Sequence, residues 1–169
     1  MIRLSQHHLT PESHLKRVRT IADYQFGKGA GEVLFPDNVT FRMSTTKRVR
    51  QILLDGKRIA TVRARDGMLT LSVFGAGKIH RHVTYPGQRV VVNSDAATFV
   101  AKGKTAFARH VVYVDPEIRA GQEVLVVDED DRLLAAGKTM LSAVEMKAFG
   151  KGTAVDVRGG IESEDRDEC

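Results

Sequence analysis

Short apolar runs separated by tight polar turns fill the sequence from Gln88 to Arg158 and limit the folds open to it. Asp115-Pro116-Glu117 breaks one run, Ala120-Gly121 turns the chain into the next, and an exposed acidic turn at residues 128–131 precedes a third. Strands are expected at residues 111–114, 123–127, 132–138 and 153–158. Short strands closed by tight turns are typical of a compact β-barrel-like domain of roughly 70 residues.

Capping residues mark a short helix inside this domain and a longer helix near the N-terminus. Ser142 and Glu145 have the spacing at which the two side chains satisfy free amides at a helix start. Thr10 as N-cap and Pro11 as first helical residue open the longer helix, which Gly27 ends. Its expected buried stripe is Leu15, Val18, Ile21, Ala22 and either Gln25 or Phe26, while Lys16, Arg17 and Arg19 face away.

From Val39 the apolar pattern changes to the period of strands. Asp55-Gly56 and Asp66-Gly67 are hairpin signals between successive runs. We expect strands at residues 39–44, 48–54, 57–64 and 68–74, in an antiparallel meander on which the long helix packs. For residues 75–87 the pattern predicts turns, with His80 and His82 at alternate positions on one side of a strand.

These elements predict an α+β chain of two domains and a tail. An N-terminal domain with a helix on an antiparallel sheet covers residues 1–87, and the barrel-like domain covers residues 88–161. The boundary at Tyr85-Pro86-Gly87 coincides with a change in charge. Residues 1–87 carry fifteen Lys and Arg against six Asp and Glu, whereas residues 88–161 carry ten of each. Residues 162–169 form an acidic tail that we expect to be disordered.

The basic N-terminal half favours a nucleic-acid partner, because phosphate neutralisation supplies much of the affinity of such complexes. Along the expected sheet, Arg48, Arg50 and Arg63 occupy polar positions between apolar ones and are expected to form a secondary basic surface. The alternative is a solvated face whose cations protect the sheet edges from pairing with other strands.

No motif for catalysis or for binding a metal or cofactor is complete. The glycine-rich segment 23–31 lacks the spacing of a phosphate-binding loop and follows a helix rather than a strand. Cys169 is the only cysteine, and His7, His8 and His14 lack the further ligands that zinc requires. No apolar run approaches the roughly eighteen residues that span a bilayer, and the N-terminus lacks a signal-peptide core. We therefore expect a cytoplasmic protein that is no enzyme and needs no cofactor or metal.

The order of the pieces in the C-terminal half resembles the PUA domain, the RNA-binding module named after pseudouridine synthases and archaeosine transglycosylases. The resemblance covers the turn from a helix into KGK, the core FARHVVYVDPEIRAGQEVLVVDEDDRLLAAGK, the helix SAVEM and the terminal strand AVDVR. It implies a β pseudobarrel that binds RNA through the turn after its first helix and the neighbouring terminal strand.

Carried onto this sequence, the resemblance selects Lys102, Gly103, Lys104, Phe107, Ala108, Arg109, His110 and Arg158 as RNA-binding residues, with Lys138 beside them. Lysine and arginine supply charge and donors for phosphate, and glycine lets a phosphate or base edge approach the backbone. A phenylalanine at the start of a strand is more often a core residue, so we expect Phe107 to be buried.

The N-terminal half, IADYQFGKGAGEVLFPDNVTF followed by KRVRQILLDGKRIATVRARDGMLTL, resembles the domain that precedes PUA in archaeosine tRNA-guanine transglycosylase. That family's catalytic domain is a TIM barrel of about 250 residues, for which this chain leaves no room. The resemblance implies an archaeal tRNA-binding protein, either a non-catalytic accessory or the separately encoded C-terminal half of the transglycosylase, with a catalytic subunit as its partner. The alternatives are a ribosome- or translation-associated PUA adaptor and a small RNA-modification enzyme.

Overall fold

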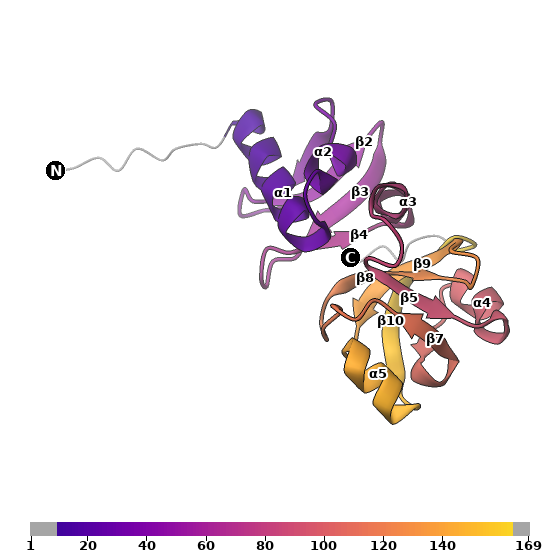
Figure 1. Cartoon of the computed structure of the whole chain (residues 1–169). Coiled ribbons are helices and arrows are strands. Elements are labelled where there is room, and N and C mark those ends of the chain that lie inside the picture. Colours follow the sequence, from indigo (N-terminus) through magenta and orange to yellow (C-terminus); the bar gives the residue numbers. More distant parts are fainter. Residues whose placement is uncertain (1–9, 164–169) are drawn as a thin grey trace.

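The computed structural model describes residues 10–163 and contains a four-stranded and a six-stranded sheet (Figure 1). The first part of the chain consists of α1 (Pro11–Phe26), α2 (Ala30–Leu34), β1 (Thr40–Met43), β2 (Val49–Leu54), β3 (Lys57–Val62), β4 (Leu69–Leu71) and α3 (Val73–His82). Strands β1 to β4 form an antiparallel meander in chain order. Asp55 and Gly56 both have positive φ, which is the conformation that joins two strands with little splay. The expected meander is therefore confirmed.

The second part of the chain forms the six-stranded sheet, in the order β6-β10-β9-β8-β5-β7, with β5 parallel to β8. Its elements are β5 (Arg89–Val92), α4 (Ser94–Ala101), β6 (Ala106–Phe107), a 3-10 turn (Ala108–His110), β7 (Val111–Val114), β8 (Glu123–Val127), β9 (Leu133–Thr139), α5 (Ala143–Phe149) and β10 (Thr153–Gly160). The nearly closed sheet is a pseudobarrel, so the predicted fold class is confirmed. Within residues 10–163 none of the helices has the length and apolarity needed to cross a bilayer.

The two capping predictions are confirmed. Thr10 Oγ1 accepts a hydrogen bond from Ser13 N at 3.2 Å at the start of α1. At the start of α5, Ser142 N donates to Glu145 Oε2 at 2.8 Å, and Glu145 N donates to Ser142 Oγ at 3.3 Å. These local bonds satisfy amides that a helix start otherwise leaves unpaired, which is why the sequence alone located both helices.

The prediction of turns is wrong for residues 75–82, because α3 occupies Val73–His82, whereas the turn expected at Tyr85-Pro86-Gly87 is present. The glycines of this segment disfavour a helix in isolation, but tertiary packing requires one of them. A Cβ at Gly75 would lie 2.2 Å from Ile59 O, so only glycine lets α3 approach β3 this closely. Since successive helical residues point in different directions, His80 and His82 do not share one side of a strand.

Arg19 was expected to face away from the protein, and this too is wrong. Its Nε and Nη2 donate to Phe35 O at 2.9 and 2.6 Å, and Nη2 also donates to Asp37 Oδ1 at 2.9 Å. Arg19 therefore ties α1 to the segment after α2. The prediction failed because it considered only the buried stripe of α1 and not the second helix that packs beside it.

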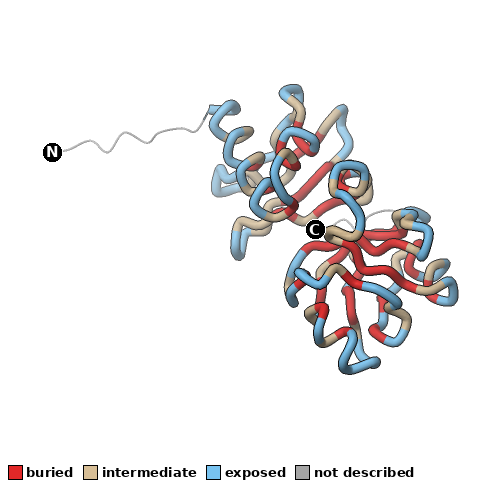
Figure 2. The backbone as a smooth tube through the Cα atoms, viewed as in Figure 1, coloured by how far each residue is buried: buried red, intermediate tan, exposed pale blue. Residues whose placement is uncertain are grey.

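The two sheets share a hydrophobic core at their junction. β5 and β8 are buried along their whole length (Figure 2). One face of these strands, with Val90 and Val124, lines the pseudobarrel core. The opposite face, which includes Val91, Leu125 and Val127, packs with Ile52, Ile59, Leu69 and Ile79 of the first part. Because both faces are covered, these strands appear in the sequence as unbroken apolar runs.

A buried ion pair closes this junction from the side of β10. Arg158 Nη1 donates to Glu123 Oε1 at 2.9 Å, and Arg158 Nη2 contacts Glu123 Oε2. Arg158 Nη2 also donates to Leu71 O at 3.0 Å, and Leu71 N donates to Glu123 Oε2 at 2.5 Å. Burial raises the pKa of Glu123, although the guanidinium of Arg158 and the amide of Leu71 act against it. The pair therefore couples β4 of the first sheet to β8 and β10 of the second.

Arg89 makes a second polar connection and corrects the prediction for the acidic turn. The Arg89 side chain is only 2% exposed and donates from Nε to Asp131 Oδ1 at 3.1 Å. Its Nη2 donates to His80 O at 2.9 Å, and its Nη1 donates to Val83 O at 2.6 Å. Asp131 is therefore not a solvated turn residue, because it neutralises an arginine that would otherwise be buried unpaired.

We expect Arg158→Ala to lower the free energy of unfolding by about 3–5 kcal/mol, because it leaves the carboxylate of Glu123 buried without a cation. The loss should be smallest below pH 4.5, the ordinary pKa of this carboxyl, because Glu123 is then protonated in both the folded and the unfolded protein. It should grow as the pH rises, because the unfolded chain then releases this proton, whereas the folded variant must either keep it or bury an unpaired charge. Urea unfolding at several pH values measures both effects.

Arg132→Ala is the matched control, because the Arg132 side chain is 74% exposed and its ion pairs are expected to contribute at most about 1 kcal/mol. The double variant Glu123→Gln with Arg158→Met keeps an acceptor for Leu71 N and removes both charges, so it should be more stable than Arg158→Ala. If Arg158→Ala and Arg132→Ala lower the free energy of unfolding equally, the Arg158–Glu123 pair does not stabilise the junction as assigned.

Candidate nucleic-acid interface

The basic turn after α4 is held rigidly by its own backbone. Lys102 N and Lys104 N donate to Phe99 O at 3.1 and 3.0 Å, and Gly103 N donates to Val100 O at 2.9 Å. Gly103 has a φ of +86°, which favours glycine at this position. The side chains of Lys102 and Lys104 are both exposed. The turn therefore presents two cations from a fixed backbone.

The end of β10 supports this turn from behind. A Cβ at Gly160 would lie 2.2 Å from Ala101 O, so glycine is required for the contact. Glu162 N donates to Ala101 O at 2.8 Å, and Gly160 N donates to Ser163 Oγ at 3.0 Å. The acidic tail thus begins against the turn, and its residues 164–169 lie outside the described part of the chain.

Phe107, on β6 after the turn, is 40% exposed, so the prediction that it is a core residue is wrong. Side chains alternate along β6, and Ala106 takes the buried position. The Arg109 guanidinium lies 5.4 Å from the centroid of the Phe107 ring, and Arg109 Nε donates to His110 Nε2 at 3.2 Å. Ala108 is buried. The segment therefore offers an aromatic face and a cation next to each other.

Arg158 and Lys138 do not lie at this turn. The guanidinium of Arg158 is held by Glu123 at the junction of the sheets. Lys138 is paired in register with Asp156 on β10, four residues before Gly160. At about 3.3 Å per residue, this separation along the strand is roughly 13 Å. The nine residues predicted as one site are spread over the turn, β6 with the 3-10 turn, β9 and β10, and Phe107, opposite Thr153, lies farther along β10 from Gly160 than Lys138 does.

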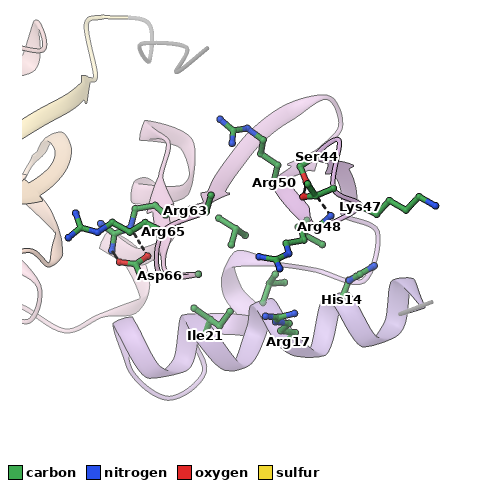
Figure 3. Close-up of a pocket in the computed structure, with 16 residues that line it drawn as sticks. His14, Arg17, Ile21, Ser44, Lys47, Arg48, Arg50, Arg63, Arg65 and Asp66 are labelled. Carbon is green, nitrogen blue, oxygen red and sulfur yellow. Dashed lines mark hydrogen bonds and ion pairs between the residues drawn. The ribbon is translucent and has the colours of Figure 1, made fainter. Parts of the chain in front are cut away.

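The three arginines of the expected secondary basic surface are among the residues around one groove of the first part, between α1 and the ends of two hairpins, although Figure 3 shows the Arg50 side chain extending away from α1. Arg63 is held by Asp66, with 2.8 Å between Nη2 and Oδ2. The amide of Met68 and the nearby guanidinium of Arg63 lower the pKa of Asp66. Figure 3 shows the Arg48 side chain pointing toward Arg17 of α1. Sequence reasoning missed Arg17 as a member of this surface, because only helix packing on the sheet brings it there.

Metal binding has no candidate site in residues 10–163, where no group of three His, Cys, Asp or Glu side chains lies close enough together. His14 lines the arginine groove and packs on Phe41, with 5.7 Å between the ring centroids. His80 Nε2 and Asp131 O are 2.7 Å apart. His7 and His8 lie outside the described residues.

Comparison with known proteins assigns both halves of the chain. Residues 16–86 match the family model of the patch-forming domain C2 of tRNA-guanine transglycosylase, and residues 88–161 match the PUA domain. A tRNA-guanine(15) transglycosylase of Pyrococcus furiosus is 47% identical over 90% of this chain and 26% of the relative. One from Methanothermobacter thermautotrophicus is 46% identical over 89% of this chain and 23% of the relative. The chain spans about a quarter of the length of these relatives.

Solved structures show the same fold at lower sequence identity. A hypothetical protein from Pyrococcus horikoshii OT3 superposes with a TM-score of 0.70 and 22% identity, over 95% of each chain. A conserved PUA domain protein from Thermoplasma acidophilum superposes with a TM-score of 0.59 and 20% identity, over 86% of this chain and 89% of the other. The chain belongs to the proteins in which a patch-forming C2 domain precedes a PUA domain, and it is homologous to the C-terminal part of archaeal tRNA-guanine transglycosylase.

Proposed function

We propose that this protein binds tRNA through the segment from Lys102 to His110 of its PUA domain. The observation that carries the proposal is one contiguous segment that exposes Lys102 and Lys104 on the rigid turn and, further along, Arg109 against the exposed ring of Phe107. Within residues 10–163 no carboxylate forms a salt bridge with any of these three cations. Arginine and lysine can therefore meet phosphates, and the aromatic face can stack on a base.

The relatives favour tRNA over other RNAs, since proteins named tRNA-guanine(15) transglycosylase match 90% of this chain at 46–47% identity. PUA domains are RNA-binding modules, and this chain has one at residues 88–161. Double-stranded A-form RNA is recognised through its shape, phosphates and 2′-hydroxyls rather than through base edges. A rigid basic turn without a base-reading helix suits that mode of binding.

The same comparison supports a non-catalytic role. The chain corresponds to the C-terminal portion of the relatives and to about a quarter of their length. Arg158 and Glu123, a largely buried charged pair, hold two sheets together rather than facing a cavity. The role proposed here is that of an accessory or separately encoded C-terminal half, which supplies tRNA affinity to a catalytic subunit.

A salt-titrated binding assay tests the ligand. It compares full-length tRNA, the same tRNA without its single-stranded 3′ end, and an RNA duplex of similar charge. A preference for intact tRNA that persists at higher salt supports recognition of a tRNA feature. If all three RNAs bind equally and all are lost as the salt concentration rises, binding depends on charge alone. That result favours a ribosome- or translation-associated adaptor.

Replacing Lys102, Lys104 and Arg109 together by alanine should weaken tRNA binding at least about tenfold at about 0.1 M salt. Each lost phosphate contact lowers the slope of log affinity against log salt by roughly 0.9, so the slope should fall by about 2–3. Filter binding across a salt series measures both. The control is Lys28→Ala with Arg119→Ala, which removes two exposed cations elsewhere. If the triple variant binds tRNA as tightly as this control, the site is refuted.

Gly160→Ala tests the geometry of the turn without changing any charge. The added Cβ collides with Ala101 O, so the turn must move, at a cost of about 1–3 kcal/mol. We expect weaker tRNA binding with an unchanged salt slope. In the control Gly77→Ala, the new Cβ meets only the end of the Arg81 side chain at 3.4 Å. If a folded Gly160→Ala protein binds tRNA as tightly as the parent protein, the position of the turn does not affect tRNA binding.

The accessory role predicts no guanine exchange into tRNA by this chain alone. When it is added to the Pyrococcus furiosus transglycosylase truncated by the quarter that matches this chain, we expect a lower KM for tRNA. Incorporation of labelled guanine measures both. Exchange by the isolated chain would contradict the non-catalytic assignment, and an unchanged KM would contradict the accessory role.

A further inference from the structure

A groove of about 560 Å³ lies between α1 and the ends of the β1–β2 and β3–β4 hairpins (Figure 3). Its walls come from three separate segments, namely residues 14–21 of α1, residues 44–50 and residues 62–67. Six cations and one acid are among its lining residues; the cations are Arg17, Lys47, Arg48, Arg50, Arg63 and Arg65, of which Lys47 and Arg50 extend away from α1 in Figure 3, and the acid is Asp66. Such a concentration of one sign of charge attracts anions strongly.

Most of these cations form no salt bridge within the described part of the chain. Arg63 pairs with Asp66, but across the described part of the chain no carboxylate pairs with Arg17, Arg48, Arg50 or Arg65. Elsewhere the arginines that hold the fold together are paired, as Arg19 is with Asp37 and Arg89 with Asp131. Like charges brought together repel each other, and a bound anion removes that repulsion. Arginines without a structural partner are therefore available to a ligand.

The composition of the groove favours a chain of phosphates over a single small anion. Even without Lys47, Arg50 and the paired Arg63, the cations Arg17, Arg48 and Arg65 come from all three segments (Figure 3) and together carry more charge than one phosphate. The aliphatic residues Val18, Ile21, Val49 and Val62 line the same groove, as do the hydroxyl residues Ser44 and Thr46. A phosphodiester backbone offers regularly spaced charges for the guanidinium groups, and its sugars offer apolar edges and hydroxyls for the other residues.

We infer that this groove is a second RNA-binding site, which takes the phosphodiester backbone of the same RNA molecule that the PUA domain binds. The inference rests on the proposed function for its RNA ligand. The junction of the sheets fixes the groove relative to the basic turn, because the shared core and the Arg158–Glu123 pair join the two parts. When two sites are linked rigidly, one ligand that reaches both binds far more tightly than either site alone allows.

The experiment compares Arg17→Ala with Arg48→Ala in one protein against the control Lys28→Ala with Arg119→Ala, which removes the same charge outside the groove. Both groove arginines are exposed, so the fold should persist, and circular dichroism checks this. At about 0.1 M salt the groove variant should bind a tRNA transcript roughly tenfold more weakly than the control, with a salt slope lower by about 2. Affinity within twofold of the control would overturn the inference.

Asp66→Asn gives a variant in which binding should improve. The asparagine oxygen can still accept the hydrogen bond from Met68 N, now 3.0 Å from Asp66 Oδ1, while the negative charge disappears and Arg63 is released. We expect tRNA affinity to rise about twofold to fivefold at low salt. Unchanged or weaker affinity would count against a phosphate ligand in this groove.

Two further measurements separate this inference from the proposed function. If Lys102, Lys104 and Arg109 can be replaced without effect while the groove variant weakens binding, the groove stands and the PUA site fails; the opposite pattern overturns the groove. Inorganic triphosphate is the probe for a small-anion site. If it binds at micromolar concentration, and the groove variant abolishes this while tRNA affinity stays unchanged, the groove serves a small polyanion and the inference is overturned.

Discussion

The burial of β5 and β8 on both faces is the constraint on which the rest of the structure depends. One face completes the pseudobarrel and the other completes the core under the first sheet, so neither core is complete without these strands. Apolar packing of this kind has no direction and does not by itself fix how two sheets are rotated. The Arg158–Glu123 pair adds direction, since Glu123 accepts from Leu71 N and Arg158 donates to Leu71 O. The backbone of β4 is thereby tied to β8 and β10.

Pairing distinguishes the cations that build this fold from those that are available to ligands. Arg89 and Arg158 are buried or half-buried, and each has a carboxylate, because an unpaired charge away from water is strongly destabilising. The cations of the basic turn and most of those in the groove are exposed and lack a carboxylate among residues 10–163. The formal charge of the whole chain, +5, does not reveal this division. It becomes visible only when each cation is assigned its partner.

The sequence predicted those features that depend on near neighbours. Ser142 with Glu145 and Asp55 with Gly56 act over two to four residues, so they located a helix start and a hairpin correctly. Most of the failures involve distant partners. Gly75 disfavours a helix until β3 lies against it, and Arg158 resembles a surface cation until Glu123 faces it. Within the candidate interface, the segment 102–110 is contiguous and could be found from the sequence. The groove could not, because its walls meet only through tertiary packing.

The rigid junction also bears on how a protein without a base-reading element can select its RNA. Phosphate contacts carry no sequence information, and a single basic patch binds any nucleic acid. Two basic surfaces held at a fixed separation and angle are more selective, because only an RNA whose backbone passes both can bind them together. This gain in selectivity is lost if the two surfaces move independently, because binding the second surface must then also fix its position relative to the first. Shape recognition by this chain would therefore depend on the buried contacts between its sheets as much as on the cations that touch RNA.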